Sequence, residues 1–243
     1  MSRWTLSSAQ FAALWARTGQ DRAPFPFDLS SDLAVAEDHA EQQRRVRQTF
    51  DGPEHDVLAA AFLLLAEPDI RIELTGSADE IPLRIIGAMT RHHGLVALQH
   101  PRSAQREGGH VVMLGCEPYD VARQVLAQIP PTEPGRYRGV QFSRGSQARP
   151  GTRVLRRPEE TSTLRPVADL LDRPTVGEGV VKVVRGPRHA GRFGGGAAWR
   201  DIRGDGRYIV FGGETVTVQP GSSWDLLGVL GSTTGVLPAG QAR

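Results

Sequence analysis

Histidine is the side chain whose spacing would most directly indicate catalysis or metal binding, and this chain has seven. His92 and His93 are adjacent, so on a strand their rings would point to opposite faces and could not chelate one ion together. His93 and His100 could share a face, but no HExxH or comparable ligand spacing accompanies them. A hydrolase or metalloenzyme acting through His93 and His100 is therefore the weakest hypothesis. The sequence predicts no metal site and no cofactor.

Other motifs of nucleophilic or phosphate chemistry are absent or incomplete. Glu54-His55-Asp56 has the residue types of a charge relay, but adjacent residues of a helix do not face one another. A GxSxG nucleophile elbow is missing. The glycine-rich residues 191–196 lack the Lys-Ser/Thr ending of a P-loop, and we expect them to form a flexible hairpin connection. Cys116 is the only cysteine, which excludes an intrachain disulfide and a cysteine-rich zinc site. The chain is not predicted to be an enzyme.

A basic stretch supplies the alternative function. Between Pro134 and Pro158 the chain carries seven arginines and no acidic residue, and such a run could bind nucleic acid or another anion. Residues 28–56 have the opposite bias, with eight acidic residues against three arginines, and the net charge of the whole chain is only +2. Two opposed patches favour an intramolecular or protein-partner surface. Nucleic-acid or anion binding through Arg136–Arg157 is kept as the alternative.

Length and composition are those of an ordinary globular protein. The 243 residues are 39% apolar, which suffices for a sizeable core in one large domain or two small ones. The longest strongly apolar stretch, Val57–Ala66, is too short to span a bilayer, and residues 1–10 lack the pattern of a secretory signal. We therefore expect a soluble, cytoplasmic protein. Lys182 is the only lysine and asparagine is absent, which indicates GC-rich codons and an actinobacterial source.

Hydrophobic periodicity predicts an α+β fold, a central antiparallel sheet with flanking helices. We expect a helix from Ser7 or Ser8 to about Gly19, a surface helix over residues 33–50, and a buried helix over residues 55–66, which are apolar on nearly all sides. Period-two alternation then predicts a meander with a turn at Gly76–Glu80. Its four strands are expected over residues 70–74, 83–86, 95–98 and 111–114, and an amphipathic helix over residues 121–129 follows.

The second half of the chain repeats this order of elements. A short strand near Gln141-Phe142 and a helix over residues 164–171 precede four strands, over residues 180–184, 197–202, 207–211 and 215–218, and a last helix capped by Ser222. A shift of 104 positions lays Val112–Leu126 on Val216–Leu230 without a gap. The match leaves open both an internal duplication, with halves at residues 3–131 and 136–231, and a chance likeness of two strand-then-helix segments.

Three stretches, taken in order along the chain, point to one family. The first joins Trp4-Thr5-Leu6 and Leu14-Trp15 to Pro24-Phe25-Pro26-Phe27. The second runs from Leu63-Leu64-Leu65-Ala66-Glu67-Pro68 into Arg71-Ile72-Glu73-Leu74. The third and most specific is Asp205-Gly206-Arg207-Tyr208-Ile209-Val210, followed by Val216-Thr217-Val218-Gln219-Pro220. Together they resemble the EspG family, the cytosolic chaperones of type VII (ESX) secretion. The chain departs from the family pattern in its short loop at Gly76–Pro82 and in the long basic connection after Gly135.

The resemblance implies one EspG-like domain over residues 1–235, with two pseudo-symmetric halves around a central antiparallel sheet and a flexible tail at residues 236–243. Such proteins are not enzymes. They bind the apolar helical tip of a PE–PPE-type substrate and keep it soluble and export-competent. The resemblance assigns partner binding to Gly76, Ser77, Ala78, Asp79, Glu80, Trp224 and Leu227. Trp224 could instead pack in the core, and a homodimer is left open.

Overall fold

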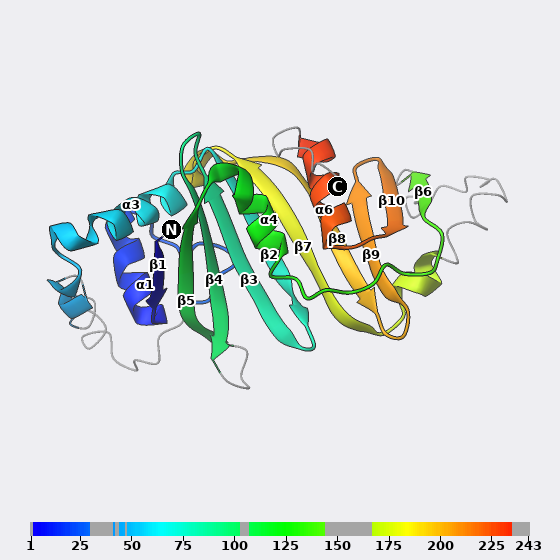
Figure 1. The fold of residues 1–243 in the computed structure, drawn as a ribbon, viewed down its shortest axis with the longest axis horizontal. Helices are drawn as coiled ribbons and strands as arrows, with labels where there is room; N and C mark the ends of the chain where they lie inside the picture. Colours follow the sequence, from blue (N-terminus) through cyan, green and yellow to red (C-terminus); the bar gives the residue numbers. More distant parts are fainter. Residues whose placement is uncertain are drawn as a thin grey trace, which may run out of the picture.

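Ten strands form one sheet in the computed structural model, which describes residues 2–29, 41, 44–46, 48–102, 107–143 and 167–234. The strand order is β1-β5-β4-β3-β2-β7-β8-β9-β10-β6, and all neighbours are antiparallel (Figure 1). Read from either edge, a short strand is followed by four strands in reverse chain order. The strands are β1 (Arg3–Leu6), β2 (Ile70–Ala78), β3 (Ile81–Met89), β4 (Gly94–Arg102), β5 (Glu107–Cys116), β6 (Val140–Ser143), β7 (Thr175–Arg185), β8 (Arg192–Ile202), β9 (Gly206–Gly212) and β10 (Thr215–Pro220).

The two halves of the sheet meet where β2 pairs with β7, from Ile70 opposite Arg185 to Ala78 opposite Gly177. Within this ladder Gly76 lies opposite Gly179. A Cβ atom at Gly76 would lie 3.0 Å from Cη2 of Trp199, and one at Gly179 would lie 2.1 Å from the same atom. Trp199 is fully buried, so its indole requires glycine at position 179, whereas at Gly76 a Cβ atom would first meet the carbonyl oxygen of Glu178 at 2.2 Å.

One face of the sheet is covered by α4 (Val121–Leu126) and α6 (Ser223–Thr234), which lie side by side over the middle strands (Figure 1). The apolar side of each helix is buried against alternate residues of the strands, as expected for a sheet with period-two side chains. Ser222 precedes α6, and its hydroxyl accepts a hydrogen bond from the backbone N–H of Asp225. The helix expected after Ser222 is thus confirmed, and the one expected over residues 121–129 is present but ends at Leu126.

The other face carries α1 (Ser8–Trp15) and α3 (Asp56–Ala66), which pack over β3, β4 and β5. Ser7 caps α1 with a capping box, because its hydroxyl accepts from the N–H of Gln10 while the Gln10 side chain accepts from the N–H of Ser7. Phe11 is fully buried, and its ring lies 5.4 Å from that of Phe27 and 5.0 Å from that of Phe62. Helix α1 therefore begins where the sequence predicts.

Two glycine-bearing segments were expected to be turns or loops and are strands. Gly76–Ala78 continues β2, so the turn comprises Asp79 and Glu80 alone, both with left-handed φ angles of 47° and 65°. Residues 192–196 belong to β8, where Gly196 lies opposite Lys182, instead of forming a flexible connection. In both cases the neighbouring strands impose the extended backbone.

The prediction that the helix over residues 55–66 is buried on nearly all sides is wrong in part. Helix α3 exists, but Val57 and Leu63 are 61% and 59% exposed. Only one side of α3 packs against the sheet, through residues such as Leu58, Phe62 and Leu65. The other side is apolar and uncovered in the part of the chain that the structure describes.

Several predictions fall largely outside the described residues. Of the helix expected over residues 33–50, residues 41, 44–46, 48 and 49 are described and helical. Of the helix expected over residues 164–171, residues 167–171 are described and helical. The tail at residues 236–243 lies outside, as does most of the Arg136–Arg157 stretch.

The core contains one fully buried charged side chain among the described residues, Arg207 on β9. Its Nε and Nη2 atoms donate to the two carboxylate oxygens of Asp201 at 2.7 and 2.8 Å. Nη2 also donates to the carbonyl oxygen of Pro130 at 2.8 Å, and Nη1 donates to the hydroxyl of Ser223 at 2.6 Å. The guanidinium therefore links two strands, the segment after α4 and the start of α6.

Arg207→Met tests how much this network stabilises the fold. Removing the guanidinium leaves the Asp201 carboxylate buried without its partner, so we expect the free energy of unfolding to fall by about 3–5 kcal/mol. Urea denaturation measures it. Arg123→Met is the control, because Arg123 is 54% exposed and pairs with Asp120 at the surface, where the expected loss is below about 1 kcal/mol. Equal losses in both variants would show that the buried network is not the stronger of the two.

Candidate functional site

Trp224 and Leu227, two of the residues assigned to partner binding, lie on the first turns of α6. Trp224 is 65% exposed and Leu227 is half-buried. Trp224 therefore does not pack in the core, and that alternative is wrong. Both residues line a pocket of about 180 Å³ between α4 and α6, which we call the α4–α6 pocket. Its other lining residues are Arg123, Leu126, Ala127, Ile129, Pro131 and Ser223.

The turn that carries Trp224 is held at several points. The carboxylate of Asp225 accepts hydrogen bonds from the backbone N–H and the hydroxyl of Ser222, each at 2.7 Å. These bonds lower the pKa of Asp225, so the carboxylate stays ionised at neutral pH and keeps both bonds. Arg207, on strand β9 of the sheet, donates a hydrogen bond to the hydroxyl of Ser223 at the start of α6. The indole of Trp224 is thus presented to solvent from a fixed backbone.

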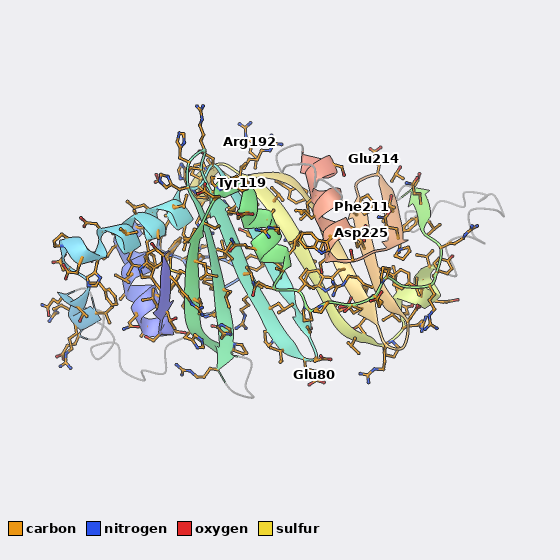
Figure 2. All side chains as sticks on the ribbon, in the orientation of Figure 1. Glu80, Tyr119, Arg192, Phe211, Glu214 and Asp225 are labelled. Carbon is orange, nitrogen blue, oxygen red and sulfur yellow. The ribbon has the colours of Figure 1, made fainter. Side chains whose placement is uncertain are left out.

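The other assigned segment, Gly76–Glu80, is divided between a strand and a turn. Gly76, Ser77 and Ala78 are half-buried members of β2, paired with β3 on one side and β7 on the other. Asp79 and Glu80 are exposed at the tip of the β2–β3 hairpin. Figure 2 shows Glu80 at this tip and Asp225 on α6. Of these five residues, the two in the turn are the exposed ones.

The buried ion pair lies between these two regions in the sheet. Asp201 lies beside the end of β7, since a Cβ atom at Gly177 would be 2.8 Å from Asp201 Oδ2 and 3.3 Å from the carbonyl oxygen of Ser77. Asp79 in turn donates its backbone N–H to the carbonyl oxygen of Val176 at 2.7 Å. Asp201 is therefore two strands away from the end of β2, through Gly177 opposite it and Ala78 opposite Gly177, and its partner Arg207 reaches the first turn of α6.

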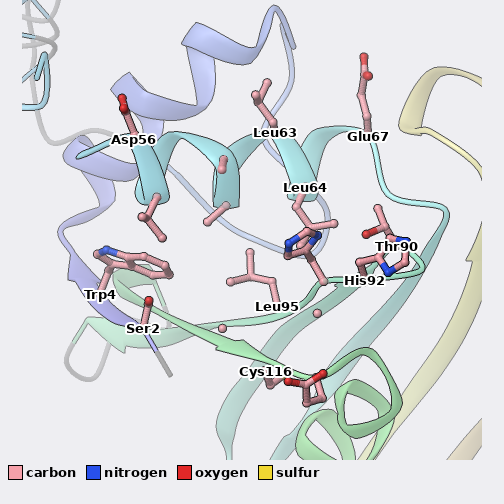
Figure 3. Close-up of a pocket in the computed structure, with 17 residues that line it drawn as sticks. Ser2, Trp4, Asp56, Leu63, Leu64, Glu67, Thr90, His92, Leu95 and Cys116 are labelled. Carbon is pink, nitrogen blue, oxygen red and sulfur yellow. The ribbon is translucent and has the colours of Figure 1, made fainter. Parts of the chain in front are cut away.

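A larger opening lies at the other end of the sheet, beneath the uncovered side of α3 (Figure 3). This α3 groove has a volume of about 840 Å³. Helix α3 forms its roof, and its floor comes from β1, from the β3–β4 turn and from the adjoining ends of β4 and β5. The lining consists of Ser2, Trp4, Asp56, Val57, Ala60, Ala61, Leu63, Leu64, Glu67, Thr90, His92, His93, Gly94, Leu95, Gly115, Cys116 and Glu117.

Cys116 lines this groove as an unreactive thiol. Burial, and to a smaller extent the nearby carboxylates of Asp120 and Glu117, together raise its pKa to about 11. A thiol with this pKa is protonated at neutral pH and is a poor nucleophile. Cys116 contributes a small apolar surface to the groove.

His93 and His100, the candidates for a hydrolase or metalloenzyme site, lie far apart in the structure. His93 lies in the β3–β4 turn and His100 near the opposite end of β4, so about 23 Å of extended strand separates them. The ring of His100 instead stacks on that of His110 at 4.4 Å. Within the described ranges, no three His, Cys, Asp or Glu residues are grouped as metal ligands.

The basic stretch contributes little to the described surface. Of its seven arginines, Arg136 and Arg138 fall within the described residues, and the other five lie outside. The backbone N–H of Arg136 donates to Asp205 at 3.0 Å. None of the helices in the described ranges combines the length and the apolar character needed to cross a membrane.

Sequence reasoning missed the α3 groove entirely. The helix that forms its roof is predicted to be buried, because apolar residues give the same sequence pattern whether the protein's own core or a binding partner covers them. The floor is assembled from Trp4, Leu95 and Cys116, which are far apart in the chain. The one available signal was the excess of apolar residues on α3 beyond a single buried stripe.

The comparisons with known proteins agree with the motifs. The model of the EspG family matches residues 7–231, which is most of the chain. The search of curated proteins found no match to the chain.

Alkylation of Cys116 tests the burial of the groove floor. Because its pKa is raised from 9.0 to about 11, the thiolate fraction at pH 8 should be about 100-fold lower than for an unperturbed thiol. We expect iodoacetamide to react with the native protein about 100-fold more slowly than with the protein in 8 M urea. Cys116 is the only cysteine, so mass spectrometry of the intact chain reports on it alone. Equal rates in both states would contradict this environment.

Proposed function

Because this chain belongs to the EspG family, which comprises chaperones associated with ESX (type VII) secretion, we propose that it binds the apolar helical tip of a PE–PPE-type substrate. Binding covers an apolar patch that would otherwise drive self-association, and so keeps the substrate soluble and export-competent. The proposal places the protein in the cytoplasm, where a substrate is held before export. EspG is a chaperone family and not a family of enzymes.

The observation that carries this proposal is the exposure of Trp224 at the rim of the α4–α6 pocket. A tryptophan that is 65% exposed on a rigid helical turn leaves a large apolar surface in water. Tryptophan is enriched among the few residues that dominate the free energy of protein–protein binding. The pocket beside it offers room for an apolar side chain of the partner. Trp224 and Leu227 would then be the apolar centre of the interface.

The hairpin turn would form part of the polar rim. Asp79 and Glu80 are exposed and charged, and polar residues at the edge of an interface fix orientation more than they add affinity. Gly76, Ser77 and Ala78 act through the backbone that carries this turn. The network of Asp201 and Arg207 holds the start of α6, and the β2–β7 and β7–β8 ladders connect it to the strand that carries the turn, so both regions could meet the partner together.

The same proposal covers the organisation of the chain. We propose one EspG-like domain over residues 1–235, built from an internal duplication with halves at residues 3–131 and 136–231. The identical strand order read from each edge of the sheet supports it. So does the equivalence of Val112–Leu126, which spans the end of β5 and α4, with Val216–Leu230, which spans β10 and most of α6.

Co-expression with PE–PPE pairs from the same genome tests the function. We expect at least one pair to co-elute with this chain in size-exclusion chromatography as a stable complex. Because capping is apolar, the complex should persist as salt is raised, whereas anion binding through Arg136–Arg157 would weaken steeply. Failure of every pair to form a complex would count against the proposal.

Trp224→Ala tests the site. Loss of a central aromatic anchor should weaken the complex by about 2 kcal/mol or more, roughly 30-fold in Kd. The free energy of unfolding should change by less than about 0.5 kcal/mol, because the side chain is mainly in solvent. Phe193→Ala is the matched control, since Phe193 is an exposed aromatic (71%) on β8 outside the pocket. Full affinity in the Trp224 variant, measured by calorimetry, would exclude this surface.

A further inference from the structure

The α3 groove is an apolar surface that none of the described residues covers and that the proposed function does not use. Val57 and Leu63 are more than half exposed, and Trp4, Leu64 and Leu95 line the space beneath them. Figure 3 shows the side chains of Trp4 and Leu95 beneath α3 and that of Leu64 reaching down from it. A contiguous apolar opening of this kind on a folded protein marks an interaction site more often than a random surface does.

The shape of the groove matches a helical occupant. Its roof follows α3 from Asp56 to Glu67, a length of about 16 Å at 1.5 Å per residue, or three helical turns. The floor is lowered by Gly115, which lies directly opposite Leu95 in the sheet. A Cβ atom at Gly115 would be in van der Waals contact with Ser2, whose carbonyl oxygen would lie 3.7 Å away, so a small side chain would fit there without a clash. An amphipathic helix could place its apolar anchors at i, i+3, i+4 and i+7 in such a groove.

The charges around the groove restrict the choice of occupant. Asp56 lies at one end of the roof, Glu67 at the other, and Glu117 at the floor, while no lysine or arginine lines the groove among the residues that the structure describes. Arg3 and Arg91 adjoin lining residues in the chain but are not part of the lining. Within the described residues, the three carboxylates form no ion pair. A partner with basic residues flanking its apolar face is therefore complementary.

A second copy of this chain fits less well. Two α3 helices that faced each other across a two-fold axis would bring the carboxylates of Asp56 and Glu67 from both copies to one interface. Like charges placed together in an interface oppose association. The acidic rim therefore disfavours a homodimer through this groove.

We propose that the α3 groove is a second docking surface, which binds an amphipathic helix of a protein partner whose apolar face enters the groove and whose flanking lysines or arginines meet Asp56, Glu67 and Glu117. The surface is separate from the α4–α6 pocket. Helix α3 lies on the opposite face of the sheet from α4 and α6. The floor strand β4 is four strand positions, or about 19 Å, from β8 beneath α6. Both surfaces can therefore be occupied at once, so that a chaperone holding its substrate can also engage a second protein.

A designed peptide probes this proposal on the full chain. The probe is a fluorescein-labelled amphipathic helix with leucines at i, i+3, i+4 and i+7 and arginines at both ends, and its twin carries glutamates in place of the arginines. Fluorescence anisotropy measures both affinities. We expect the arginine-flanked peptide to bind in the micromolar range and the twin at least about tenfold more weakly. Asp56→Asn combined with Glu67→Gln should reduce this preference.

Substitutions in the groove locate the binding. Ala60→Arg places a cationic side chain inside the groove, and Gly115→Leu fills its floor; each should weaken the arginine-flanked peptide at least about tenfold. Ala59→Arg is the matched control, because Ala59 is exposed on the same helix and outside the groove lining. Thermal unfolding midpoints confirm that each variant is folded. Trp224→Ala should leave peptide binding within about twofold of the wild type, which separates this proposal from the proposed function.

Three results would overturn the proposal. The first is equal binding of both peptides, or equal binding by Ala60→Arg and Ala59→Arg, which would indicate unspecific apolar attraction. The second is the absence of binding up to about 100 μM, since a matched groove should do better. The third is a wild-type dimer in sedimentation velocity that Ala60→Arg dissociates, which would assign the groove to a second copy of the chain.

Discussion

The pairing of β2 with β7 is the constraint on which the rest of the structure depends. It is the only ladder that joins the strands before α4 to those after residue 174 in the described sheet. Its register places Gly76 opposite Gly179 under the buried indole of Trp199. A slip of one residue would turn every side chain of one strand to the other face and bring a side chain against that ring. Because α4 and α6 pack on the two sides of this joint, the α4–α6 pocket exists only in this register.

A twisted sheet of ten strands has two large faces, and the chain uses them differently. On one face, α4 and α6 leave a small pocket with an exposed tryptophan beside it. On the other, α3 covers the sheet incompletely and leaves a longer, acidic-rimmed groove. The first surface is suited to a compact apolar end, and the second to the side of a helix. Such a division would allow a chaperone to hold a substrate and to be recognised by a second protein without competition between them.

Alternation of apolar and polar residues predicted the strands well, because half-buried strands such as Ile70–Leu74 show their pattern directly in the sequence. It failed for Gly76–Ala78 and for residues 192–196, because glycine carries no hydrophobic signal and its extended backbone is imposed by neighbouring strands. The family resemblance assigned Trp224 to partner binding but left open whether its side chain is exposed. The pattern of an amphipathic helix does not reveal which of its apolar residues face solvent. The α3 groove could not be predicted at all, because its walls are distant in the chain and meet only in the folded sheet.

The central claim is that the first turns of α6 and the tip of the β2–β3 hairpin contact one substrate together. Hydrogen–deuterium exchange of the free chain and of its complex with a PE–PPE pair tests this most directly. The account predicts slower amide exchange on binding at residues 223–228 and at residues 78–81, with little change at residues 56–67. Protection confined to α3, or to one of the two predicted regions alone, would contradict it.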